Sequence, residues 1–241
     1  MGVSGMAKKK TSGGRTGLER VGGTVFFVFY LLLLPLAAGP ARGLAEELLG
    51  RPVSGELYGA AYYYGLFAVT AILFHHTLAV STRRFLDEPA LTLKTAAVGV
   101  VAHYGLLELA SRLGRLFADR SANLNDAAIS ARTGSAPHMT LLIVVFLAPF
   151  VEETLFRGLV FGGLREKSRP LAYAVSCALF ALLHVWQFAL ANRDPAYFLL
   201  MVQYLIPGLV LAWAYDHGGT LWASIGLHAG VNALAVLAGA V

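Results

Sequence analysis

Seven long apolar segments dominate this chain of 241 residues. They cover residues 21–39, 58–80, 91–110, 139–163, 170–192, 196–216 and 220–241. A helix needs about 20 mostly apolar residues to cross the hydrocarbon core of a bilayer. The chain is 57% hydrophobic and 14% charged, whereas a soluble domain is about 45–50% apolar and about 25% charged. The sequence therefore predicts an all-α, polytopic membrane bundle of about seven to eight transmembrane helices, and it excludes a soluble enzyme.

Basic residues are unequally divided between the two sides of the predicted membrane. Residues 1–20 carry five of them among Gly, Ser and Thr, which predicts a disordered cytoplasmic tail. With the N-terminus inside, the cytoplasmic side receives eleven lysines and arginines and the other side receives seven. The positive-inside rule then predicts a multi-pass protein with a cytoplasmic N-terminus, and the Gly-, Ala- and Arg-rich composition favours a bacterial inner membrane. Topology also accounts for the net charge of +5, so no nucleic-acid partner is expected.

The fourth apolar segment carries three charged residues near its middle, Glu152, Glu153 and Arg157. On insertion scales each of them costs about 2.5–3.5 kcal/mol at the bilayer centre. Side chains that face a polar cavity avoid much of this cost, which favours a functional site. The alternative is a structural Glu–Arg pair that only joins helices.

Two later segments each contribute one histidine. His184 follows Phe180 by four residues, and His228 precedes Asn232 by four. Residues i and i+4 share one face of a helix, so His228 and Asn232 point the same way. At about 1.5 Å per residue, Glu152, His184 and His228 lie roughly 17, 21 and 12 Å from the cytoplasmic ends of their spans. These depths are compatible, and we expect the groups to meet inside the membrane.

This set of side chains supports two kinds of hydrolysis. In the first, Glu152 is a general base for water, and His184 orients that water. His228 and Asn232 then donate hydrogen bonds to the oxyanion that forms when a carbonyl is attacked. In the second, Glu152, His184 and His228 hold a catalytic zinc ion with water at the open position. The metal-free mechanism is favoured and no cofactor is expected, with zinc as the alternative.

Three sequence motifs occur in a fixed order within residues 139–241. EETLFR at 152–157 resembles the EExxxR motif, FALLH at 180–184 resembles FxxxH, and WASIGLHAGVN at 222–232 resembles the motif that ends in HxxxN. These are the motifs of the CPBP family, the CAAX-protease and bacteriocin-processing (Abi) intramembrane endopeptidases. The first 138 residues add little to the resemblance.

The resemblance implies a helical membrane fold with a conical catalytic cavity open towards the cytoplasm. It implies that Glu152 is the base, that His184 is its water-orienting partner and that His228 and Asn232 form the oxyanion hole. Supporting roles fall to the remaining motif residues, Glu153, Arg157 and Phe180. The expected organisation is a tail at 1–20, N-terminal transmembrane helices and a polar loop at 21–138, and a catalytic core at 139–241.

The leading functional hypothesis is an intramembrane endopeptidase acting on a membrane-tethered partner in the lipid bilayer. Its substrate is a CAAX-like peptide, a peptide leader or a C-terminal sorting tag. A transporter or proton relay uses similar intramembrane Glu, His and Arg residues, and a non-catalytic immunity protein would retain the same fold. Outside the motifs, Tyr58, Tyr62, Tyr63 and Tyr64 predict an aromatic belt at the outer interface, and Gln187 and Gln203 are candidate cavity residues.

Overall fold

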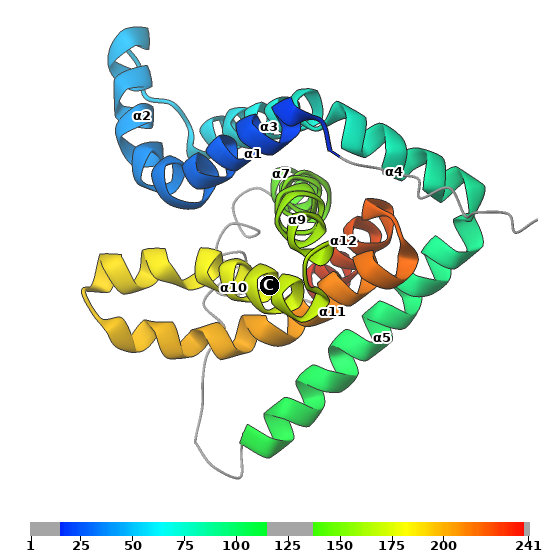
Figure 1. Ribbon diagram of the computed structural model, residues 1–241. Coiled ribbons are helices and arrows are strands. Elements are labelled where there is room, and N and C mark those ends of the chain that lie inside the picture. Colours follow the sequence, from blue (N-terminus) through cyan, green and yellow to red (C-terminus); the bar gives the residue numbers. More distant parts are fainter. Residues whose placement is uncertain (1–14, 115–136, 239–241) are drawn as a thin grey trace, which may run out of the picture.

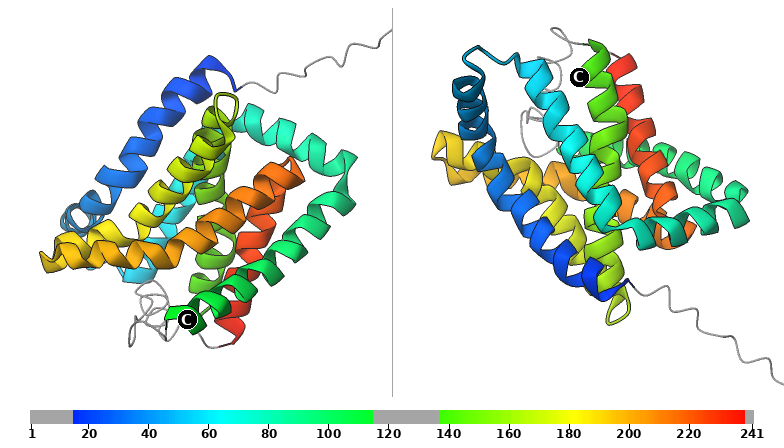
Figure 2. Two further views of the ribbon diagram at one scale, coloured as in Figure 1. Left: turned by 60° about the horizontal axis from the view of Figure 1, so that its bottom comes forward. Right: turned by 90° about the horizontal axis from the view of Figure 1, so that it is seen from above.

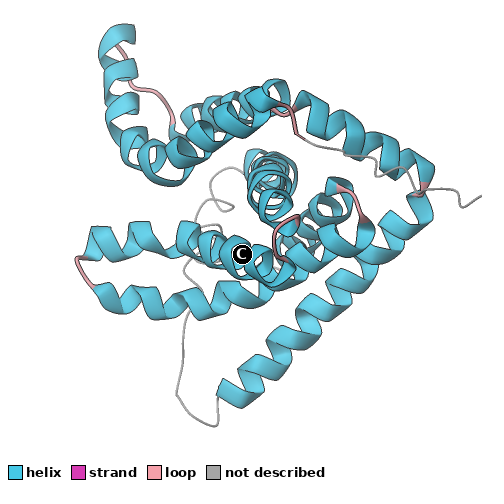
Figure 3. Cartoon of the chain, viewed as in Figure 1, coloured by secondary structure: helices cyan, strands magenta, loops and turns pink. Residues whose placement is uncertain are grey.

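The computed structural model describes residues 15–114 and 137–238, and all regular elements in these residues are helices (Figure 1, Figure 3). The first half contains α1 (Gly17–Val28), η1 (Phe29–Leu33), α2 (Leu34–Leu49), α3 (Gly55–Leu73), α4 (His75–Asp87) and α5 (Pro89–Gly114). The second half contains α7 (Pro137–Leu142), η2 (Ile143–Leu147), α8 (Ala148–Glu153), η3 (Thr154–Phe161), α9 (Gly162–Arg165), α10 (Arg169–Asn192), η4 (Pro195–Leu200), α11 (Met201–Gly218) and α12 (Leu221–Leu237). The predicted all-α class is confirmed. Most of the predicted polar loop at 111–138 lies outside the described residues.

The consecutive segments from α7 to α9 form one long helix at the centre of the bundle (Figure 1). Segments η2 and α8 contact α3 and α12, while η3 contacts α1 and α10. Helix α5 packs along α11 and α12 on the outside. The charged motif at 152–157 is therefore enclosed by helices from both halves of the chain.

Side-chain caps and one glycine set the ends of the helices around the site. The Ser168 hydroxyl accepts a hydrogen bond from the Leu171 N–H at the start of α10, and Thr220 accepts from the Trp222 N–H at the start of α12. Helix α11 ends at Gly219, whose φ of 67° lies in the left-handed region that glycine adopts without a Cβ clash. Helix α12 can therefore fold back directly against α11.

Four helical stretches among the described residues are long and apolar enough to cross a membrane. They are Gly17–Leu49, Pro89–Arg112, Arg169–Asn192 and Pro195–Gly218. Helices α3 and α4 make a fifth if they count as one span, although the chain bends by 82° between them. The seven predicted spans exceed this number. The second apolar segment is bent, the fourth is divided among short helical segments, and α12 has only 17 residues.

The bend between α3 and α4 is stabilised by a carboxylate from α1. Glu19 is fully buried, and its Oε1 accepts a hydrogen bond of 2.7 Å from the Thr77 N–H in the first turn of α4. Its Oε2 accepts a second hydrogen bond, from the Thr16 N–H, at 2.8 Å. Free N–H groups in the first turn of a helix favour such an anionic partner. Glu19 therefore fixes where α4 begins.

The same contacts correct one boundary of the predicted tail. Thr16 and Glu19 form a reciprocal capping box, so that α1 begins at Gly17. The predicted disordered tail at 1–20 is therefore too long by four residues, and residues 1–14 lie outside the described part of the chain.

Polar contacts join α4 to the start of α12. The Leu221 N–H donates to Ser81 Oγ at 2.6 Å, and the Thr220 hydroxyl donates to the Ser81 carbonyl at 2.8 Å. The indole N–H of Trp222 donates to the Thr82 hydroxyl at 3.0 Å. Helix α12 carries two of the predicted site residues, and α4 anchors its first turn.

Substituting Gly218 by alanine is expected to destabilise the bundle. The added methyl would lie 2.6 Å from the Cβ atom of Ala223 and 3.4 Å from Thr95 Cγ2. A Cβ atom has no rotamer to change, so α11 and α12 must shift, at a cost of about 1–3 kcal/mol. Thermal unfolding in detergent measures the loss. Gly226→Ala is the matched control, because its methyl would lie 3.8 Å from Ala96 Cβ. Equal losses in the two variants would contradict the packing argument.

Candidate active site

Two adjacent glutamates point from the central helix into different surroundings. They end α8, a six-residue helix between the π-helices η2 and η3, and π-helical turns occur frequently at functional sites. Glu152 lines a cavity. Glu153 is fully buried and is bonded to Arg157 and His228. Since successive residues lie about 100° apart around a helix, neighbouring carboxylates take separate roles here.

The cavity beside Glu152 has a volume of about 850 Å³. Its walls come from the α1–α2 helix, α3, the central helix and α10, and its polar lining includes Tyr30, Tyr62, Tyr63, Glu152, His184 and Gln187. The Glu152 side chain is buried, and its Oε2 has no hydrogen-bond partner among the described residues. Because Glu152 is a lining residue of the cavity, its carboxylate can meet a water molecule or a substrate there.

His184 faces the same cavity from α10. Its Nδ1 lies 2.8 Å from the carbonyl oxygen of Phe180. Because a carbonyl can only accept, Nδ1 carries the hydrogen, and Nε2 of the neutral ring keeps its lone pair. The ring stacks on Tyr204 with a centroid separation of 4.7 Å. These contacts fix the ring and leave Nε2 as its reactive atom.

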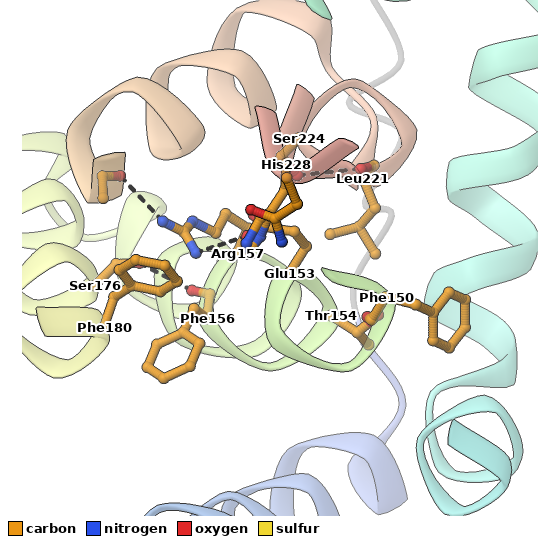
Figure 4. Close-up of polar contacts among 12 residues, drawn as sticks. Phe150, Glu153, Thr154, Phe156, Arg157, Ser176, Phe180, Leu221, Ser224 and His228 are labelled. Atoms are coloured by element: carbon orange, nitrogen blue, oxygen red, sulfur yellow. Dashed lines mark hydrogen bonds and ion pairs between the residues drawn. The ribbon is translucent and has the colours of Figure 1, made fainter. Parts of the chain in front are cut away.

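A second group of polar side chains forms a buried network between the central helix, α11 and α12 (Figure 4). Glu153 Oε1 accepts hydrogen bonds from Arg157 Nη1 at 3.0 Å and from His228 Nδ1 at 2.8 Å. Arg157 Nη2 donates to the Gly208 carbonyl at 3.1 Å. Glu153 and Arg157 are both fully buried. An unpaired charge at this depth would be strongly unfavourable, so the pair depends on each partner.

Phe180 contacts both His184 and the buried network, and Figure 4 shows its ring beside Arg157. The guanidinium carbon of Arg157 lies 4.5 Å from the centre of the Phe180 ring. The ring centroids of His184 and His228 lie 4.6 and 6.1 Å from the same centre. One aromatic ring therefore sets the spacing between two motif histidines and the motif arginine.

Replacing Phe180 with leucine is expected to loosen this arrangement. The variant loses the cation–π contact with Arg157, worth about 0.5–2 kcal/mol, and the ring contacts of both histidines. Thermal unfolding in detergent should show the loss. Phe198→Leu is the control, because the Phe198 side chain is 42% exposed. A Phe180→Leu protein as stable as the control would show that the ring contributes little.

Carbonyl groups in the π-helices accept hydrogen bonds from side chains far away in the sequence. The amide nitrogen of Asn232 donates to the Val144 carbonyl in η2 at 2.8 Å. The Arg15 guanidinium donates to the carbonyls of Gly158 and Leu159 in η3. A π-helix shifts the pattern of backbone pairing, and these donors compensate for the shift. They hold the segments that precede and follow the two glutamates.

The structure separates the predicted site residues into two groups. Glu152 and His184 lie at the cavity, as expected, and Phe180 contacts His184. His228 and Asn232 were expected at the same cavity, but neither is among its lining residues. The physical reason is that the described conformation uses Nδ1 of His228 for Glu153 and the Asn232 amide for Val144.

Some residues at the site were missed or misassigned from the sequence. Tyr62 and Tyr63, expected in an interfacial belt, line the cavity instead. Tyr30 lines it as well, from the other side of the sequence. Of the two glutamine candidates, Gln187 lines the cavity and Gln203 does not. The spacing of Tyr58 and Tyr62, one helical turn apart, is the signal that marks a polar face on α3.

The zinc alternative requires Glu152, His184 and His228 to converge on one ion. Among residues 15–114 and 137–238, no three His, Cys, Asp or Glu side chains are grouped closely enough to hold a metal. His228 Nδ1 is bonded to Glu153. The predicted ligand set does not fit this arrangement.

Comparison with known proteins agrees with the motif analysis. The family model described as "Type II CAAX prenyl endopeptidase Rce1-like" matches residues 134–234. A curated relative, UPF0177 protein YxdF of Lactococcus lactis, is 27% identical over 109 residues, which cover 45% of this chain and 55% of the relative. The match thus spans about half of that protein's length. No solved structure matches. Residues 134–234 of this chain are therefore similar to the Rce1-like CAAX prenyl endopeptidases, in agreement with the three sequence motifs.

Proposed function

We propose that the protein is an intramembrane endopeptidase that uses Glu152 to activate water. The observation that carries this proposal is the buried Glu152 carboxylate, which lines a cavity together with His184. The similarity of residues 134–234 to the Rce1-like CAAX prenyl endopeptidases supports the same conclusion.

The proposed reaction begins with a water molecule between Glu152 and His184. The water donates one hydrogen bond to the Glu152 carboxylate and the other to Nε2 of His184. As the water oxygen attacks the peptide carbonyl carbon, Glu152 takes its proton, and the carbonyl oxygen becomes an oxyanion. The tetrahedral intermediate then collapses. Its C–N bond breaks, and Glu152 transfers the proton to the departing amine.

His228 and Asn232 are the proposed donors to the oxyanion. The hydrogen bond from His228 Nδ1 to Glu153 orients the imidazole, and Nε2 donates to the oxyanion when the ring is the doubly protonated imidazolium. The Asn232 amide has two N–H groups, of which one is bonded to Val144. Preorganised donors of this kind are worth about 10²–10³-fold in rate each. His228 and Asn232 do not line the cavity. The mechanism therefore requires that the entering substrate place its scissile carbonyl next to them.

Comparison of peptide termini in membranes tests the proposal. Cells that express the wild-type protein or Glu152→Ala at equal abundance are compared by mass spectrometry of membrane-protein termini. A defined set of new termini that requires Glu152 is expected, and the flanking residues would assign the substrate to a CAAX-like peptide, a leader or a sorting tag. Identical termini from two equally folded proteins would overturn the protease proposal and leave transport or binding.

A further inference from the structure

Tyr30 is a buried polar residue at the cavity that the three sequence motifs do not include. It lies in the π-helix η1 and is only 7% exposed. Its ring belongs to the apolar core together with Phe27 and Leu31, and the residue also lines the cavity that contains Glu152 and His184. The Tyr30 hydroxyl forms no hydrogen bond with another described residue. The O–H group of a buried tyrosine usually has a partner, and the cavity is the place where Tyr30 can meet one.

A contact between α1 and the central helix places Tyr30 at the level of Glu152. The two helices run in opposite directions, since α1 starts beside the α9–α10 turn, at the end of the central helix away from α7 (Figure 2). The rings of Phe27 and Phe156 lie 5.2 Å apart. Tyr30 comes one helical turn after Phe27, and Glu152 comes one turn before Phe156. The Glu152 carboxylate is also among the charged groups that act on the Tyr30 phenol.

The other uncharged hydrogen-bond donors of the lining lie farther from Glu152. On α3, the ring of Phe67 lies 4.5 Å from that of Phe150, and the lining tyrosines of α3 come at least one turn earlier. On α10, Gln187 comes almost one turn after His184. Both differences point towards the α2–α3 and α10–η4 connections, where the lining ends. Among the described lining residues, Tyr30 is therefore the neutral donor at the level of Glu152.

The reaction proposed for Glu152 needs a donor at this level. The Glu152 carboxylate and Nε2 of His184 both accept hydrogen bonds from the water, so neither can donate to the peptide carbonyl oxygen. His228 and Asn232 can donate, but they lie outside the lining. Negative charge develops on the carbonyl oxygen as the water attacks, and a fixed donor aimed at this oxygen stabilises the transition state.

We propose that Tyr30 is a further catalytic residue, whose hydroxyl donates a hydrogen bond to the carbonyl oxygen of the scissile peptide. The proposal rests on the proposed function of Glu152. When the water oxygen bonds to the carbonyl carbon, the electron pair of the C=O π bond moves to the oxygen, and Tyr30 donates to the resulting oxyanion. Tyr30 keeps its proton throughout. Glu152 takes the proton of the water and transfers it to the amine when the C–N bond breaks.

The variant Tyr30→Phe removes the hydroxyl and keeps the ring in the core. With a substrate defined by Glu152-dependent termini, its kcat per folded protein should fall about 10²-fold, the usual cost of removing one oxyanion donor. KM and the thermal unfolding temperature should change little. Tyr64→Phe is the matched control and should keep the wild-type kcat, since Tyr64 is 50% exposed and is not a lining residue. An unchanged kcat in Tyr30→Phe, or a higher KM alone, would overturn the proposal.

Difluorotyrosine incorporated at position 30 separates hydrogen-bond donation from packing. This side chain has nearly the shape of tyrosine, but its phenol ionises at a lower pH and then has no hydrogen to donate. Cleavage should be retained at low pH and should be lost at a lower pH than in the wild-type protein as the pH rises. Identical pH profiles of the two proteins would overturn the role of the hydroxyl.

Glu152→Gln, measured in parallel, distinguishes failure of this proposal from failure of the proposed function. Full activity of Glu152→Gln would contradict the proposed function itself. Loss of activity in Glu152→Gln together with a normal kcat in Tyr30→Phe would contradict only the role of Tyr30.

Discussion

Replacing Glu152 with glutamine is expected to lower the rate of peptide cleavage about 10²- to 10⁴-fold, the usual contribution of a general base. Glutamine keeps the size of the side chain and removes only its ability to take a proton. Because Glu152 Oε2 has no hydrogen-bond partner among the described residues, the thermal unfolding temperature should change little. Cleavage of a substrate defined by its termini, followed in detergent or in liposomes, measures the effect.

Two neighbouring substitutions provide controls for this result. Glu47→Gln removes an exposed carboxylate of α2 and should leave the rate unchanged. Glu153→Gln removes the adjacent carboxylate and should reduce stability, because its charge is paired with Arg157. Full activity of Glu152→Gln would contradict the assignment of the base. If Glu152→Gln and Glu153→Gln lose equal amounts of folded protein, the carboxylates of Glu152 and Glu153 do not have separate roles.

Replacing Arg157 with methionine is expected to be the most destabilising single change at the site. The guanidinium is fully buried, and it contacts Glu153, the Gly208 carbonyl and the Phe180 ring. Removing one partner of a buried ion pair costs about 3–5 kcal/mol, because the other charge stays buried. Folded yield and thermal unfolding in detergent measure the loss. Arg169→Met should cost about 1 kcal/mol or less, since the Arg169 side chain is 68% exposed.

A second substitution separates the cost of the unpaired charge from the loss of packing. Glu153→Gln in the Arg157→Met background neutralises the buried carboxylate, and the amide oxygen still accepts from His228. The double variant should be more stable than Arg157→Met alone, because contacting residues are not additive. A double variant that loses the sum of both single effects would show that Glu153 and Arg157 act independently.

The residue types of the site could be predicted from the sequence, but their partners could not. Three charges in an apolar segment indicated a polar interior, and Glu153, Arg157 and His228 do form a buried network. The sequence left open whether the Glu–Arg pair joins helices or lines a cavity. In the structure both possibilities occur, at adjacent residues. Glu153 forms the pair that joins helices, and Glu152 lines the cavity. Helical periodicity places the two carboxylates about 100° apart, but it does not reveal which of them faces the cavity.

Long-range contacts account for most of what the sequence analysis missed. Arg15 was assigned to a disordered tail, yet it donates to carbonyls more than 140 residues away. A free carbonyl in a π-helix has no signature in its own side chain, so its distant donor cannot be inferred. The tyrosines of α3 were equally ambiguous, since an aromatic belt and a cavity wall use the same residue type.

The helices around the site differ in how firmly they are held. Beside the buried network, α4 fixes the first turn of α12 through Ser81 and Thr82. At the cavity wall, α2 has no buried residue along its length, and it contains Pro40. Displacement of α2 therefore breaks few interactions, whereas displacement of α12 breaks several. Helix α2 therefore sets the width of the cavity, although it takes no part in the chemistry. The size of the substrate that fits can change through α2 without any change at Glu152.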